Sequence, residues 1–212
     1  MNIIFNIFND ILRYLFDLTG DWGMAIVLLT VIVKLILMPF SLKQKSSLKK
    51  QQELSLKVEE LKKTFKNNKK KLEMELQKHY DSNKKHMFGC MITFIQLPII
   101  MTLYNVVLKL PIEASTSIIP WVTSLKLADN YHIIPLVYSS LMCMPNLISY
   151  LKVIKNSTIQ PISKSNVIVT IVISILFTIK TPIAIGIYLI TSAAFAVIEN
   201  IIYSIFFKEN LA

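Results

Sequence analysis

The sequence predicts an all-α membrane protein with five transmembrane helices, an N-terminal interfacial amphipathic helix and a cytoplasmic helical hairpin. Three observations support this fold class. Of the 212 residues, 53% are hydrophobic, and the mean hydropathy of +0.53 is too high for a soluble domain. Several uncharged stretches are long enough to cross a bilayer. Most of the positive charge gathers between the first two of these stretches.

The N-terminal segment, residues 1–20, is predicted to be an amphipathic helix that lies in the membrane interface. Its polar residues recur at helical spacing, and apolar residues cover the remaining positions. It lacks the basic start of a signal peptide. Gly20 and Asp21 then predict a turn, and Trp22 is an interfacial aromatic residue at the head of the first span.

The first span is expected at 21–40 and is followed by a basic segment at 41–87. This segment contains 14 Lys and 6 acidic residues, which is +8 of the total net charge of +10. The positive-inside rule and anionic lipids account for such a charge, so we expect the segment in the cytoplasm. Apolar residues at helical spacing predict that it forms a helical hairpin. Sequence-specific nucleic acid is not an expected partner.

The remaining elements follow from the alternation of apolar and polar stretches. They are a second span at 88–110, an extracytoplasmic loop at 111–132, a third span at 133–154, a cytoplasmic loop at 155–166, a fourth span at 167–180, a fifth span at 182–207 and a cytoplasmic tail at 208–212. The loop charges place the N-terminus outside and the C-terminus in the cytoplasm.

Lys34 lies inside the first apolar stretch, which runs from Gly23 to Phe40. A cation at the centre of a span costs roughly 2.5–3.5 kcal/mol to insert, so it normally faces water or a partner. One interpretation is that the side chain reaches the nearer membrane surface, close to Pro39. The other is that it faces a hydrated groove that several helices share.

Polar side chains on single faces of four spans favour the groove. Ser and Thr also return hydrogen bonds to their own helix, which explains most single intramembrane hydroxyls. Four such faces together with charged residues are harder to explain in this way. The candidate groove residues are Lys34, Thr30, Thr93, Gln96, Ser174, Thr178, Tyr188, Thr191, Ser192 and Glu199.

Glu199 is the acid that we expect to partner Lys34, directly or through water. Lys34 comes 12 residues after Trp22, and Glu199 comes 16 residues after Ile183. At roughly 1.5 Å per residue, the depths of the two groups below the outer surface differ by about 6 Å. A charge pair would offset the cost of removing each group from water.

Several motifs resemble a known family. They are Asp21-Trp22-Gly23-Met24-Ala25-Ile26, Lys34 followed by Met38-Pro39, Phe88-Gly89-Cys90, Ile95-Gln96-Leu97-Pro98-Ile99, Leu103-Tyr104, and the stretch from Pro182 to Tyr188. Together they resemble the YidC/Oxa/Alb family of membrane protein insertases over nearly the whole chain. The resemblance implies a lone cation, here Lys34, in a groove that is open to the cytoplasm and to lipid but closed to the outside. It also implies that Gln96 and Tyr188 line this groove.

The chain departs from the family pattern at several positions, among them His86-Met87, where a Pro is usual, and Ile92, where a Pro is frequent. In the family this cation is usually Arg. Lys34 carries the same charge but lacks the planar set of N–H donors of an arginine guanidinium. Glu199 stands where relatives often carry an uncharged amide, and Ala184 replaces the Gly that follows Pro182. These differences indicate a divergent member.

The resemblance implies a bacterial plasma membrane protein that inserts and helps to fold nascent membrane proteins. The ribosome, the Sec translocon, the signal recognition pathway and anionic lipids are the expected partners. No cofactor is expected and the protein is not expected to be an enzyme, because no nucleophile–base pair, phosphate loop or complete metal site is found. The alternative is a small transporter or channel that uses a Lys34–Glu199 pair, but the sequence contains no internal repeat.

Overall fold

The computed structural model describes residues 2–65, 91–109, 114–150 and 164–206. Within these residues it contains six helices and no strand: α1 (Asn2–Thr19), α2 (Trp22–Thr64), α4 (Met91–Lys109), α5 (Ile133–Tyr150), α6 (Lys164–Thr178) and α7 (Ile183–Phe206). The all-helical prediction is confirmed for this part of the chain. The second half of the expected hairpin, most of the 155–166 loop and the 208–212 tail lie outside the described residues.

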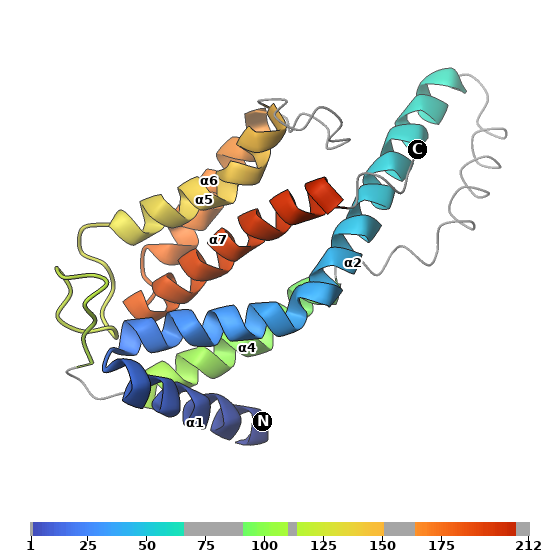
Figure 1. Ribbon diagram of the computed structural model, residues 1–212. Coiled ribbons are helices and arrows are strands. Elements are labelled where there is room, and N and C mark those ends of the chain that lie inside the picture. The colour runs from blue at the N-terminus through green and yellow to red at the C-terminus, as the bar shows by residue number, and fades with distance from the viewer. Residues whose placement is uncertain (1, 66–90, 110–113, 151–163, 207–212) are drawn as a thin grey trace.

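Helix α7 lies at the centre of the bundle (Figure 1). One side of α7 packs against α2, and the other packs against α5, which in turn packs against α6. Helices α1 and α4 complete the side of the bundle around α2. The buried core joins these helices through residues such as Leu12, Ile26, Val107 and Ile183. Because α2 and α7 meet near the middle of the bundle, their polar residues are the ones that packing can bring together.

Helix α2 does not end where the first span was expected to end. It continues for 43 residues, from Trp22 to Thr64, with Pro39 inside it. The helix changes direction about halfway along (Figure 1), where the proline ring removes one backbone donor and crowds the preceding turn. The first half of the predicted cytoplasmic hairpin is therefore a bent extension of the first apolar helix.

In the part of the chain that the structure describes, two helices are long and apolar enough to cross a membrane. They comprise Trp22–Ser47, with a mean hydropathy of 2.5, and Ile183–Tyr203, with a mean hydropathy of 1.8. Shorter apolar stretches occupy Ile99–Lys109, Ile133–Pro145 and Val167–Thr178. Helix α6 begins at Lys164, three residues before the predicted fourth span, and ends at Thr178.

The loop at 114–132, called the cap here, joins four helix ends. The first backbone N–H groups of α7 donate to it: Ile183 N–H to the Leu127 carbonyl (2.8 Å) and Ala184 N–H to the Leu125 carbonyl (3.0 Å). Asp129 accepts from the Ile134 N–H at 2.8 Å near the start of α5, and the Lys126 ammonium donates to the Leu108 carbonyl at 2.9 Å near the end of α4. The cap thus satisfies helix-end groups that would otherwise lack partners.

Asp21 joins the cap to the fourth helix end, the start of α2. Its carboxylate accepts from the Met24 N–H (3.0 Å), the Thr116 hydroxyl (2.7 Å) and the Ser117 N–H (2.5 Å). Burial alone would raise the pKa of this carboxyl, but these hydrogen bonds outweigh it and hold the pKa below its ordinary value. Gly23 permits the close approach, because a Cβ there would lie 2.2 Å from the Thr116 hydroxyl oxygen.

Candidate functional site

Lys34 lies on α2 in the half of the helix that precedes the bend, and its side chain is partly buried. The residues that follow it, Leu35 and Ile36, are exposed. Lys34 is also within electrostatic reach of Glu199 on α7. An ammonium group therefore lies in the otherwise apolar first half of α2, and its side chain is neither fully buried nor fully exposed.

Glu199 pairs with a lysine other than the expected one. Its side chain is 5% exposed and forms an ion pair with the Lys45 ammonium at 3.3 Å. It also accepts a hydrogen bond from the Ser41 hydroxyl at 2.6 Å. Among the described residues this is the one ion pair that the structure contains. Glu199 therefore contacts Lys45 directly rather than Lys34, and the other expected form of the pair, through water, stays a prediction.

The continuation of α2 past Pro39 explains this difference. Glu199 was placed about 24 Å below the outer surface by the helical rise, and Lys34 about 18 Å. Ser41 comes 19 residues after Trp22, which places it about 28 Å deep on the same rise. Ser41 is nearer to the depth of Glu199 than Lys34 is. Lys45 follows one helical turn later, beyond the bend, where the straight-helix rise no longer gives the depth of a residue. These two residues were missed because the segment was assigned to a separate solvated hairpin.

Most of the predicted groove hydroxyls form hydrogen bonds with their own helix. The hydroxyls of Thr30, Thr178 and Thr191 donate to carbonyls one turn earlier, at 2.6, 2.7 and 2.8 Å respectively. Ser174 donates to the Ile171 carbonyl at 3.0 Å. Ser192 is buried on α7. These contacts fit the simpler interpretation of intramembrane hydroxyls, so they do not by themselves indicate a wet surface.

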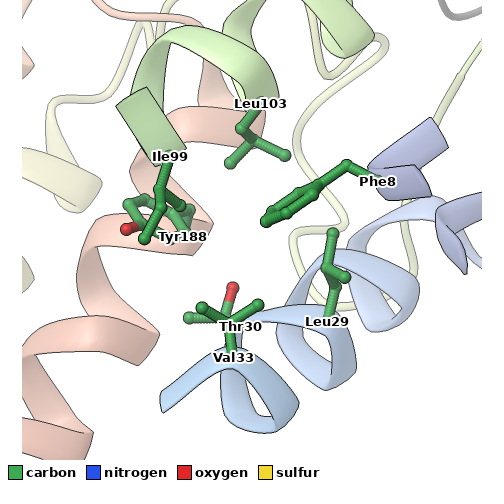
Figure 2. A pocket seen from close by; sticks show the side chains of 7 residues that line it. All are labelled: Phe8, Leu29, Thr30, Val33, Ile99, Leu103 and Tyr188. Carbon is green, nitrogen blue, oxygen red and sulfur yellow. The ribbon is translucent and has the colours of Figure 1, made fainter. Parts of the chain in front are cut away.

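A small cavity brings two of the predicted residues together. Seven side chains from α1, α2, α4 and α7 point toward it (Figure 2): Phe8, Leu29, Thr30, Val33, Ile99, Leu103 and Tyr188. Its volume of about 10 Å³ is near the lower limit for one water molecule. In this conformation the space is therefore nearly filled by apolar side chains.

The other predicted residues are distributed over the bundle. Ser174 and Thr178 lie on α6, whose main helix contact is with α5 rather than α2. Thr93 and Gln96 lie on α4, but their side chains are outside the described residues. Within the described part of the chain, no group of three or more His, Cys, Asp or Glu side chains could hold a metal ion. Phe8 of α1 lines the cavity and was not predicted, because its segment was assigned to the membrane interface.

The comparisons of this chain with known proteins agree on one protein family. The sequence pattern of the family described as "60Kd inner membrane protein" matches residues 14–210. A "Membrane protein insertase YidC" from Caldanaerobacter subterraneus subsp. tengcongensis is 28% identical over 195 residues, which is 92% of this chain and 90% of that protein. The protein of the same name from Helicobacter pylori strain 26695 is 35% identical over 136 residues, which is 62% of this chain but only 24% of the relative.

A solved structure has the same fold. It is described as "Active YidC insertase crystal structure with the first transmembrane domain resolved" and superposes with a TM-score of 0.69 at 24% identity, over 93% of this chain and 45% of that chain. The present chain thus spans less than half of that protein and nearly all of the Caldanaerobacter relative. The match over residues 14–210 shows that the chain belongs to the 60Kd inner membrane protein family, the YidC/Oxa/Alb family.

Proposed function

We propose that this protein inserts membrane proteins into the bacterial cell membrane and helps them to fold, using Lys34 in a hydrated groove that opens to the cytoplasm, without nucleotide hydrolysis. Family membership supports the insertion activity, since relatives are named as membrane protein insertases. Insertases of this family are not enzymes. The work of insertion then comes from shortening the apolar distance that a polar segment must cross.

The position of Lys34 is the observation that carries the mechanism. A partly buried ammonium on an apolar helix produces a positive potential where solvent screening is weak. An acidic segment of a substrate would be attracted to this potential and would lose less free energy on leaving water. The groove would form where α1, α2, α4 and α7 meet, beside Thr30 and Tyr188, and it would have to widen because the present cavity is nearly filled.

The cap would close the groove on the outside. Its backbone hydrogen bonds to the start of α7 and its side-chain contacts with Asp21 and Leu108 hold the helix ends together at that side. In the proposed topology the N-terminus is outside, the five apolar helices span the membrane, and α1 lies in the outer interface. Exposed apolar residues on α1, among them Ile7 and Leu18, fit a helix that contacts lipid.

The proposed partners follow from the same topology. The extension of α2 beyond Pro39 would lie in the cytoplasm, where lysines near its end, such as the exposed Lys62, could contact anionic lipids and ribosomal RNA at the exit site. The nascent membrane protein is the proposed substrate. The Sec translocon and the signal recognition pathway are the further partners that we propose.

Reconstituted vesicles provide the test. A single-span substrate with an acidic outer tail should insert about tenfold less efficiently into vesicles that contain the Lys34→Ala variant, if the potential contributes about 1.4 kcal/mol. Lys34→Arg should retain the charge and most of the activity. Lys43→Ala is the matched control, because Lys43 is an exposed lysine on the same helix. Equal insertion by wild type and Lys34→Ala would refute the electrostatic mechanism.

The transporter alternative loses its main support. It required Lys34 and Glu199 as a coupling pair, but Glu199 pairs with Lys45 and Ser41 instead. No observation among the described residues now favours a transporter or channel over an insertase.

A further inference from the structure

The contact of Glu199 with Ser41 and Lys45 lies just beyond the bend in α2. Ser41 and Lys45 are four residues apart, so they share one face of the helix. Their hydroxyl and ammonium groups both bond the same carboxylate oxygen, at 2.6 and 3.3 Å. The Lys45 ammonium also approaches the Ala196 carbonyl at 3.4 Å, one turn before Glu199 on α7. The bent extension of α2 is thus fastened to α7 at this point.

The burial of Glu199 and Lys45 makes their ion pair important for the net charge near the bend of α2. The side chains of Glu199 and Lys45 are 5% and 17% exposed. A buried charge without a partner is strongly destabilising, so each member holds the other in place. If Lys45 were absent, the carboxylate would still be buried and would still lie within electrostatic reach of Lys34.

Lys34, Lys45 and Glu199 together carry two positive charges and one negative charge. Because Glu199 is committed to Lys45, the potential near Lys34 keeps the sign of one net cation. Without Glu199, Lys45 would add a second cation about three helical turns from Lys34, since the two lysines are 11 residues apart on α2. Without Lys45, Glu199 would oppose Lys34. Loss of Glu199 therefore raises the net positive charge around Lys34, and loss of Lys45 lowers it.

We propose that Glu199 is a positioning residue that sets the charge selectivity of insertion: by pairing with Lys45 at the bend of α2, it leaves one net positive charge among Lys34, Lys45 and Glu199 and so determines how acidic a substrate tail the protein accepts. This proposal rests on the proposed insertase function. It adds a determinant of which substrates are preferred, located on α7 and acting through α2.

The test compares substrates that differ only in tail charge. Single-span substrates with acidic, neutral and basic outer tails are inserted into vesicles that contain wild-type protein, Glu199→Gln, Lys45→Gln, the double variant or the control Lys43→Gln. The measured quantity is the ratio of acidic-tail to neutral-tail insertion for each protein. A general loss of folded protein lowers both values equally and leaves this ratio unchanged.

The expected changes in this ratio have opposite signs for the two single variants. Glu199→Gln should raise it by about threefold or more, because Lys45 becomes an additional free cation. Lys45→Gln should lower it by a similar factor, because Glu199 then opposes Lys34. The double variant should return to within about twofold of wild type, since the net charge is restored. Lys43→Gln should leave the ratio unchanged, and basic tails should show the reverse order.

Two failures are distinguishable. If wild-type protein does not insert the neutral-tail substrate, the proposed insertase function fails. If wild-type protein inserts it but the acidic-to-neutral ratio is the same in all variants, the contact is only a structural fastening and the proposal is overturned. A change of the same sign in Glu199→Gln and Lys45→Gln would also overturn it.

Discussion

Replacement of Asp21 by alanine should loosen the cap over the start of α2. The carboxylate accepts three hydrogen bonds, from the Met24 N–H at 3.0 Å, the Thr116 hydroxyl at 2.7 Å and the Ser117 N–H at 2.5 Å. Loss of the first removes the N-cap of α2, which costs about 1 kcal/mol. Hydrogen bonds to a charged group contribute about 1.5–3 kcal/mol each, and we take the lower end because the site is partly open to solvent.

These terms add to about 4 kcal/mol, and solvent screening at this partly open site reduces them, so Asp21→Ala should lower the free energy of opening the cap by about 2–4 kcal/mol. The contribution should also depend on pH. The folded pKa of Asp21 lies below its unfolded value, so the stabilisation is fully present above the unfolded pKa and is lost as the pH falls through the folded pKa. Acidification below about pH 4 should therefore weaken the cap in wild type. Asp21→Ala should lack that part of the pH dependence.

Amide hydrogen exchange of residues 114–132 in detergent micelles measures this opening directly. The exchange rate of protected cap amides, such as Leu125 N–H, should rise by roughly thirtyfold or more for a change of about 2 kcal/mol. Asp17→Ala is the control, because Asp17 is an exposed acid on α1. If Asp21→Ala exchanged as slowly as Asp17→Ala, the three hydrogen bonds would not hold the cap and the argument would be wrong.

Three further substitutions test other contacts of the bundle. Gly186→Ala should lower the free energy of unfolding by about 1–3 kcal/mol, because the new Cβ would lie 2.5 Å from Ile134 Cγ2. Adding Ile134→Ala should recover part of this loss, and thermal unfolding of the single and double variants measures both changes. Lys126→Met should cost about 0.3–1 kcal/mol through its bond to the Leu108 carbonyl, and exchange at the end of α4 should report it. Thr178→Val should change the melting temperature by only a few degrees, because its hydroxyl bonds its own helix; a large loss would indicate a contact with another helix.

The helices were predictable because apolar periodicity and loop charge depend on local sequence. Gly20 ends α1 in a left-handed conformation with φ of 68°, as its place in the predicted turn implied. The end of the first span was not predictable in the same way. Pro39 was taken as a boundary, but a proline can bend a helix without ending it when neighbouring helices stabilise both halves.

The partner of Glu199 was missed for a related reason. Helical rise alone gives depth and not the direction in which a side chain points. The lysines after Pro39 were counted together as one solvated segment, yet Lys45 is mostly buried against α7. Only the course of the bent helix distinguishes Lys45 from its exposed neighbour Lys43. Charge counting over a segment therefore describes only the average of its residues, and it hid the one lysine that pairs with Glu199.

The contacts at the two ends of the α2–α7 pair differ in kind, and this difference bears on where a groove would open. At the cap end, backbone N–H groups of Ile183 and Ala184 bond the cap, which also bonds Asp21. Separating the helices there would break several hydrogen bonds at once. Beyond the bend, the described contacts include side-chain bonds of Ser41 and Lys45 to one carboxylate, which water can replace more easily as the site becomes hydrated. We therefore expect exchange with solvent to begin at the Glu199 end. Faster labelling of single cysteines near the cap than near Glu199 would contradict this order.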